Sequence, residues 1–72
     1  MATMEAVVFI GEQLKDMRVR RAMSQDDLAE KAGVGLNTVN RLERNRTEPR
    51  PSTLRKLAEA LDVDPGELVG DA

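Results

Sequence analysis

Apolar residues recur three and four positions apart along most of this chain, the spacing that places side chains on one face of an α-helix. They form four inward-facing stripes: Ile10, Leu14 and Met17; Leu28, Ala29 and Ala32; Val39 and Leu42; and Leu54, Leu57, Ala58 and Leu61. The first stripe predicts a helix over residues 9–23, and the third predicts a helix over residues 36–44. The pattern therefore predicts an all-α fold.

Capping residues mark both ends of the predicted second helix. Ser24 is a good N-cap, and with Asp27 it forms a variant of the capping box at the positive end of the helix. Gly33 can take a positive φ without steric cost, so it is expected to end this helix.

Two prolines mark later helix starts. Pro51 suits the first position of a fourth helix, and Asp64 suits the N-cap of a short fifth helix that begins with Pro65 and has Glu67 in its first turn. We expect five helices in one compact domain over residues 10–69. An extension or arm over residues 1–9 precedes it, and a short tail over residues 70–72 follows.

The second and third helices are separated by a very short turn. Only Val34 and Gly35 stand between Gly33 and the third helix, which favours a helix-turn-helix over residues 25–44. Ala29 is small enough for the two helices to cross closely. Five residues of the third helix are left projecting outward: Leu36, Asn37, Asn40, Arg41 and Arg44.

Composition narrows the chemistry. The 72 residues include no cysteine, no histidine and one aromatic residue, Phe9. Disulfides, thiolate-held metals and the commonest general base are therefore excluded. The scattered carboxylates form no nucleophile–base pair or ligand cluster, so we expect no enzyme, cofactor or metal site. The short apolar run over residues 6–10 lacks a basic flank, and no stretch reaches the length of a membrane span, which favours a soluble cytoplasmic protein.

Charge is unevenly distributed along the chain. The net charge is −2, but residues 35–56 carry six basic and two acidic side chains, whereas residues 57–72 carry five acidic and no basic ones. One basic zone on an otherwise acidic molecule is compatible with a solvated surface, and it is also what a duplex-binding protein requires.

The sequence resembles the Cro/C1-type helix-turn-helix domain of phage repressors and bacterial regulators. The resemblance covers residues 10–68 and is carried mainly by SQDDLAEKAGV, TVNRLERNRTEP and LRKLAEALDV. It implies a five-helix, lambda-repressor-like fold. It also implies a sequence-specific DNA-binding transcriptional regulator, with a repressor as the first expectation, that inserts its third helix into the major groove.

The resemblance also implies roles for individual residues. Base contacts are expected from Leu36, Asn37, Asn40 and Arg41, and phosphate contacts from Gln25, Arg44, Asn45, Arg46, Thr47 and Arg50. Arg41 could bind guanine and Asn37 adenine, each through two hydrogen bonds, and Leu36 could pack on a thymine methyl group. For these polar residues the alternative is a solvated helix surface or a weak surface ion pair.

Arg18 and Glu43 are implied to form a buried or half-buried ion pair with a structural role. The sequence departs from the family pattern at three positions. Gly35 stands where a Ser or Thr usually caps the third helix, Leu36 replaces a residue that is usually polar, and Arg50 occupies a cap position often filled by Ser.

The expected partner is double-stranded DNA with a two-fold symmetric site, bound by a homodimer; the alternative is a monomer in solution that pairs only on DNA. Leu68 and Val69 are candidates for the dimer contact. The alternative function is an antitoxin or another protein-interaction module on the same fold, with a toxin as one possible partner. That alternative predicts an exposed apolar patch, and the candidate residues are Met4, Val7, Val8 and Phe9.

Overall fold

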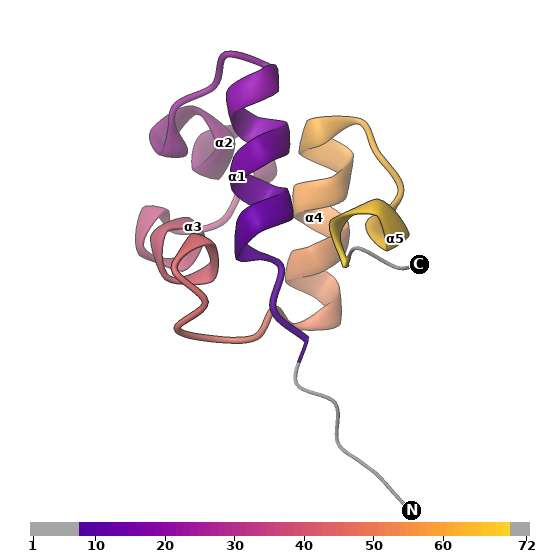
Figure 1. Cartoon of the computed structure of the whole chain (residues 1–72). Coiled ribbons are helices and arrows are strands. Elements are labelled where there is room, and N and C mark those ends of the chain that lie inside the picture. Colours follow the sequence, from indigo (N-terminus) through magenta and orange to yellow (C-terminus); the bar gives the residue numbers. More distant parts are fainter. Residues whose placement is uncertain (1–7, 70–72) are drawn as a thin grey trace, which may run out of the picture.

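A computed structural model describes residues 8–69, and over this range the chain forms five α-helices joined by short turns (Figure 1). The helices are α1 (Gly11–Arg20), α2 (Gln25–Ala32), α3 (Leu36–Glu43), α4 (Pro51–Leu61) and α5 (Pro65–Leu68). The all-α, five-helix prediction is confirmed. No helix of this described range is long and apolar enough to cross a membrane.

The first helix is shorter than predicted at both ends. The prediction of residues 9–23 is wrong, because α1 spans Gly11–Arg20. At its start, the Gly11 N–H donates to the side-chain oxygen Oδ1 of Asn45 at 2.9 Å. Because Asn45 is far away in the sequence, the spacing of apolar residues could not predict this helix start. At its end, Ala22 takes a left-handed φ of 55°, which turns the backbone out of the helix.

The third helix ends one residue earlier than predicted. Arg44 is the C-cap, with ψ near 6°, and Asn45 follows with a left-handed φ of 55°. The prediction of a helix through residue 44 is corrected by that single residue.

The caps of α2 are those expected from the sequence. Ser24 Oγ accepts from the Asp27 N–H at 2.9 Å, and Asp27 Oδ2 accepts from the Ser24 N–H at 2.9 Å, so the capping box is complete. Gly33 takes a φ of 72°, and the following Val34 N–H closes on the Ala29 carbonyl at 3.0 Å. Both predictions are confirmed, since each depends on neighbours along the chain.

The ends of the last two helices are also set by residues close to them in the sequence. Pro51 is the first residue of α4, and Asp62 ends that helix with a left-handed φ of 59°. At α5, Glu67 Oε2 accepts from the Asp64 N–H at 3.2 Å.

The core is aliphatic and draws on every helix. Its fully buried large side chains are Ile10, Leu14, Leu28, Val39, Leu42, Leu57, Leu61 and Leu68. Each leucine removed from water in this way contributes roughly 1.5–3 kcal/mol. Because Leu68 belongs to this core, it is not available for a dimer contact, and that expectation is corrected.

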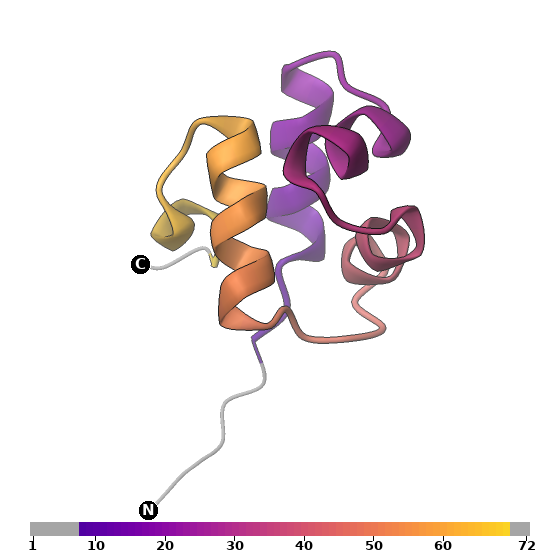
Figure 2. The same cartoon turned by 180° about the vertical axis from the view of Figure 1, so that it is seen from behind.

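The helix arrangement leaves one side of α3 uncovered. α2 packs against α3 and α4, α1 packs against α3, and α5 closes the core against α1 and α4. Figures 1 and 2 show α2 and α3 on one side of α1 and α4, with α5 on the other side. The helix-turn-helix and the acidic C-terminal helix therefore face away from each other.

Candidate nucleic-acid interface

α3 presents a polar, exposed face opposite its buried one. Val39 and Leu42 point into the core, whereas Leu36, Asn37 and Arg41 are exposed. Leu36 is 43% exposed, so its side chain is available for an external contact. Gly35, the N-cap of α3, supplies no side-chain hydrogen bond.

The turn between α2 and α3 holds this face outward. Residues 33–35 join α2 to α3, the two helices pack against each other, and Ala29 of α2 is buried. The arrangement is a helix-turn-helix whose second helix is supported from below by the core.

A two-bond ion pair joins α1 to the end of α3. Arg18 Nε donates to Glu43 Oε2 at 2.6 Å, and Arg18 Nη2 donates to Glu43 Oε1 at 3.0 Å. The side chains are 11% and 3% exposed, so the structure contains the half-buried pair that the resemblance implied. The hydrogen bond from Arg18 to Glu43 raises the pKa of the guanidinium above its usual value, and the carboxylate charge adds to the rise, while burial opposes it.

Arg18 also binds the turn that precedes α2. Its Nη1 donates to the Met23 carbonyl oxygen at 2.7 Å. One guanidinium therefore fixes α1, the start of α2 and the end of α3 together.

The Gln25 side chain forms hydrogen bonds with two other side chains of the protein. Its Nε2 donates to Glu43 Oε1 at 3.0 Å, and its Oε1 accepts from Asn40 Nδ2 at 3.3 Å. We call Arg18, Glu43, Gln25 and Asn40 the polar network. Gln25 was expected to donate to a phosphate and Asn40 to contact a base, but each has a polar atom bound to the other.

The exposed residue Asn45 also makes a hydrogen bond within the protein. Its Oδ1 accepts from the Gly11 N–H, so it fixes the loop after α3 to the start of α1. The phosphate contact expected of Asn45 would come from its NH₂ group, which this hydrogen bond does not use.

The remaining expected phosphate ligands lie at the surface near α3. Arg44, Arg46 and Arg50 are exposed and Thr47 is half-buried. Within residues 8–69 the ion pairs are Arg18–Glu43 and Arg20–Asp16, so the arginines of α3 and of the loop after it have no carboxylate partner there.

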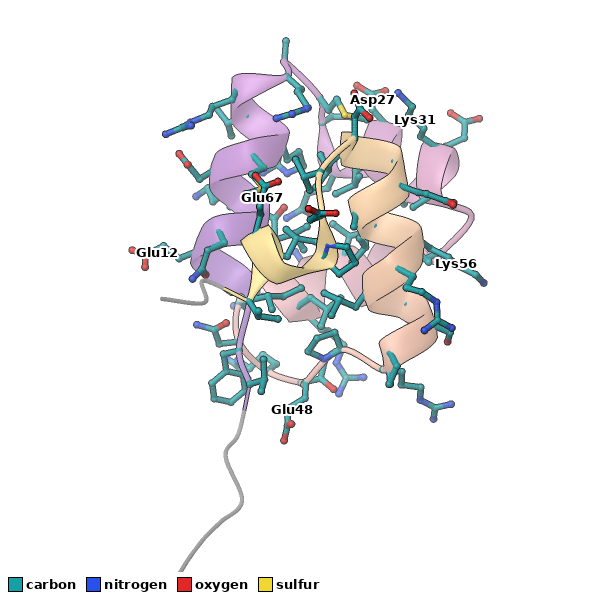
Figure 3. The ribbon with its side chains drawn as sticks, turned by 90° about the vertical axis from the view of Figure 1, so that its right-hand side faces the viewer. Glu12, Asp27, Lys31, Glu48, Lys56 and Glu67 are labelled. Atoms are coloured by element: carbon teal, nitrogen blue, oxygen red, sulfur yellow. The ribbon has the colours of Figure 1, made fainter. Side chains whose placement is uncertain are left out.

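A shallow hollow connects α3 to the first turn of α4. Its lining consists of Thr38, Arg41, Leu42, Thr47, Glu48, Pro49, Arg50 and Thr53. Most of its polar groups are guanidinium or hydroxyl donors, which suit an anion. Glu48 is the exception, but in Figure 3 it projects from the lower end of the molecule.

Sequence reasoning did not identify Thr38 and Thr53 as part of this hollow. Thr38 precedes Arg41 by one helical turn, and Thr53 lies in the first turn of α4. The available signal was the short 45–50 loop, which must bring the start of α4 close to the end of α3.

Comparison with known proteins defines the family. The helix-turn-helix family HTH_3, of the Cro/C1 type, matches residues 14–68 of this chain. The chain belongs to this family.

Two relatives illustrate the similarity, one in sequence and one in structure. The cryptic phage CTXphi transcriptional repressor RstR of Vibrio cholerae is 37% identical over 60 residues, covering 83% of this chain and 54% of RstR. The restriction-modification controller protein C.AhdI of Aeromonas hydrophila superimposes with a TM-score of 0.81 at 34% identity, covering 86% of this chain and 94% of that one.

A third relative was solved with DNA. SinR, a master regulator for biofilm formation known from Bacillus subtilis, superimposes in its DNA complex with a TM-score of 0.79 at 38% identity. The match covers 83% of this chain and 97% of that one. The chain spans about half the length of the curated relatives it matches, as with RstR.

Proposed function

We propose that this chain binds double-stranded DNA in a sequence-specific manner and regulates transcription by placing α3 in the major groove. The observation that carries this proposal is the exposed polar face of α3, bordered by arginines that have no acidic partner within residues 8–69. A protein surface of this kind neutralises phosphates and releases their counterions. The relatives named repressors, and SinR bound to DNA, support the same function.

The exposed residues of α3 suit direct reading of bases. The Arg41 guanidinium can donate twice to guanine O6 and N7, and the Asn37 amide can bind adenine N6 and N7. Leu36 can pack on a thymine methyl group, which compensates for its lack of hydrogen-bonding atoms.

The arginines around α3 suit the DNA backbone. Arg44, Arg46 and Arg50 lie beyond the reading face, and Thr47 adds a hydroxyl donor beside them. Contacts of this kind set the position and orientation of the protein without reading sequence. The hollow between α3 and α4 is the proposed seat of one phosphate.

The working form is proposed to be a homodimer on a two-fold symmetric operator, because one small domain reaches few bases. Repression then needs no chemistry, since occupation of the operator excludes polymerase. A bacterial or phage regulator of this kind acts in the cytoplasm, where the DNA is.

Salt dependence tests this function. Binding to a random-sequence duplex should weaken steeply as salt rises, with a log–log slope of about −0.9 for each phosphate neutralised. A flat line, or no binding at micromolar protein, would contradict the proposal.

One observation favours a second function. Val8 and Phe9 are 39% and 46% exposed and stand next to each other at the start of the described chain. They provide an apolar contact for a protein partner, as an antitoxin would need, while Met4 and Val7 lie outside the described residues. Phe9→Glu should abolish such a complex and leave duplex affinity unchanged. A complex that survives Phe9→Glu would rule out this surface.

A further inference from the structure

The start of α3 carries two successive residues without any side-chain hydrogen-bonding group. Gly35 is the N-cap and makes no side-chain hydrogen bond, and Leu36 is the first residue of the helix. An N-cap is ordinarily filled by Ser, Thr, Asn or Asp, each of which has a polar side chain. The first turn of the proposed reading helix therefore begins with an apolar side chain as its outermost group.

The Leu36 side chain lies on the same exposed face as the proposed base readers. Leu36, Asn37 and Arg41 are exposed, whereas Val39 and Leu42 of the same helix are buried. Residues near the N-terminus of a recognition helix are the ones that contact base edges in the major groove. The exposed part of Leu36 is therefore placed where bases would lie.

Acidic side chains beside Leu36 disfavour the DNA backbone at this place. A shallow hollow between α2 and α3 is lined by Asp26, Ala29, Glu30, Val34 and Leu36. Its two carboxylates repel a phosphate, and its other side chains have no group that could bind one. An uncharged, apolar group is therefore the contact that Leu36 can make.

The major groove offers one apolar group, the methyl group on C5 of thymine. Cytosine has no methyl group there, but 5-methylcytosine carries one at the same position of the ring. The two methylated pyrimidines differ at C4, where thymine has an acceptor and 5-methylcytosine has a donor. A leucine side chain has neither, so it cannot distinguish the two by hydrogen bonding.

We propose that Leu36 reads a C5-methyl group and not a particular pyrimidine, so that methylation of a cytosine at its operator position strengthens binding. This inference rests on the proposed DNA-binding function. It names a further ligand class, duplex DNA methylated at C5 of cytosine, and makes affinity for such an operator depend on the methylation state of the DNA.

The test measures the effect of one methyl group in two base-pair contexts. Sites are selected from a random duplex pool, and each thymine of the selected site is then replaced by uracil, which removes only the methyl group. At one position of each half-site, the wild type should bind the uracil duplex about 3- to 10-fold more weakly. With cytosine at that position, adding the C5-methyl group should strengthen binding by the same factor, because the same contact is gained.

Leu36→Asn removes the apolar surface and keeps the branched shape of the side chain. Because Leu36 is 43% exposed, we expect this variant to fold, and thermal unfolding checks that it does. Both methyl effects should disappear in Leu36→Asn. Asn37→Ala is the matched control on the same exposed face, and it should lose sequence preference at a different position while keeping both methyl effects.

Two outcomes with intact DNA binding would overturn the inference. If no uracil substitution weakens the wild type more than it weakens Leu36→Asn, Leu36 contacts no methyl group. If uracil weakens binding but methylation of cytosine at the same position does not strengthen it, the contact recognises thymine as a base and not its methyl group. Failure of the wild type to bind any duplex is a different result, because it overturns the proposed function itself and the methyl contact with it.

Discussion

Gly11 lies so close to the end of α3 that it has no room for a side chain. A Cβ at this position would lie 2.4 Å from Asn45 Oδ1, 2.5 Å from the Glu43 carbonyl oxygen and 2.8 Å from that of Leu42. Two of these are backbone atoms, which cannot move aside cheaply. We expect Gly11→Ala to lower the free energy of unfolding by about 1–3 kcal/mol, as overpacking does, measured by urea titration.

A second helical glycine provides the control for that prediction. A Cβ at Gly66 in α5 would meet nothing within 4 Å. Gly66→Ala should therefore stabilise by about 0.4–1 kcal/mol through the unfolded state. The same sign of effect in both variants would refute the claim that α1 and the end of α3 are in close contact.

The Arg18–Glu43 pair should matter far more than the other ion pair of α1. Removing one partner strands a charge where little water reaches, so Arg18→Ala should cost on the order of 3–5 kcal/mol in chemical unfolding. Arg20 and Asp16 also form an ion pair, but they are 72% and 57% exposed, and Arg20→Ala should cost at most about 1 kcal/mol. A modest effect of Arg18→Ala, similar to that of Arg20→Ala, would contradict the structural role.

At the scale of the element, the capping box of α2 makes stability depend on pH. The hydrogen bond from the Ser24 backbone N–H, and then that with the Ser24 hydroxyl, lower the pKa of Asp27 below its usual value of 3.8. The ionised carboxylate is thus favoured in the folded state. Its stabilising effect should be fully present well above pH 3.8 and be lost as the pH falls through the lower, folded-state pKa.

The measurement is the difference in unfolding free energy between the wild type and Asp27→Asn across this range. That difference should stay constant near neutral pH and shrink below pH 3.8. Ser24→Ala should keep most of the pH dependence, because the backbone N–H of residue 24 remains. If the difference grew as the pH fell, the ionised form of Asp27 would not be the one that the folded state favours, and the prediction would be wrong.

α3 and the loop that follows it are proposed to make different kinds of contact. Arg41 projects from the reading face of the helix, and Arg46 lies beyond its end. Arg41→Ala should relax sequence preference at one position, worth about 1–3 kcal/mol, whereas Arg46→Ala should weaken all duplexes alike. Quantitative binding to matched and mismatched duplexes measures both effects, and identical behaviour of the two variants would refute the division.

The helices also differ in how far the sequence could predict them. The starts of α2, α4 and α5 follow from residues within three positions of each cap, and all three were predicted. The start of α1 depends on Asn45, 34 residues away, and no periodicity could reveal it.

The candidate site shows the same division between local and distant causes. The exposed face of α3 follows from its helical period, so Asn37 and Arg41 could be placed from the sequence. The internal bonding of Gln25 and Asn40 depends on how α2 and α3 meet, and it changes what these two residues are free to bind.

At the scale of the whole molecule, the acidic residues of the last two helices lie together in space. The exposed acidic residues after α3 and its loop lie on the later part of α4, on α5 and in the turn between them, and they include Glu59, Asp62, Asp64 and Glu67. Figures 1 and 2 place α5 on the side of the molecule away from α3. These acidic residues repel a polyanion from the side of α5, which favours the proposed orientation with α3 toward the DNA.

That orientation, together with two-fold pairing, makes operator spacing a sharp test of the whole assembly. If two copies bind as a dimer, their reading helices should enter successive major grooves about 34 Å apart, or about 10–10.5 base pairs. Inserting about 5 base pairs between the half-sites of a selected operator turns one half-site to the opposite face of the duplex, and should abolish binding of the second copy. Inserting about 10 returns it to the same face but moves it about another 34 Å away, beyond the reach of the same dimer, so binding of the second copy should stay lost. Band-shift titration with stoichiometry measured by sedimentation follows both effects, and a chain that binds each half-site independently at every spacing would be acting as a monomer.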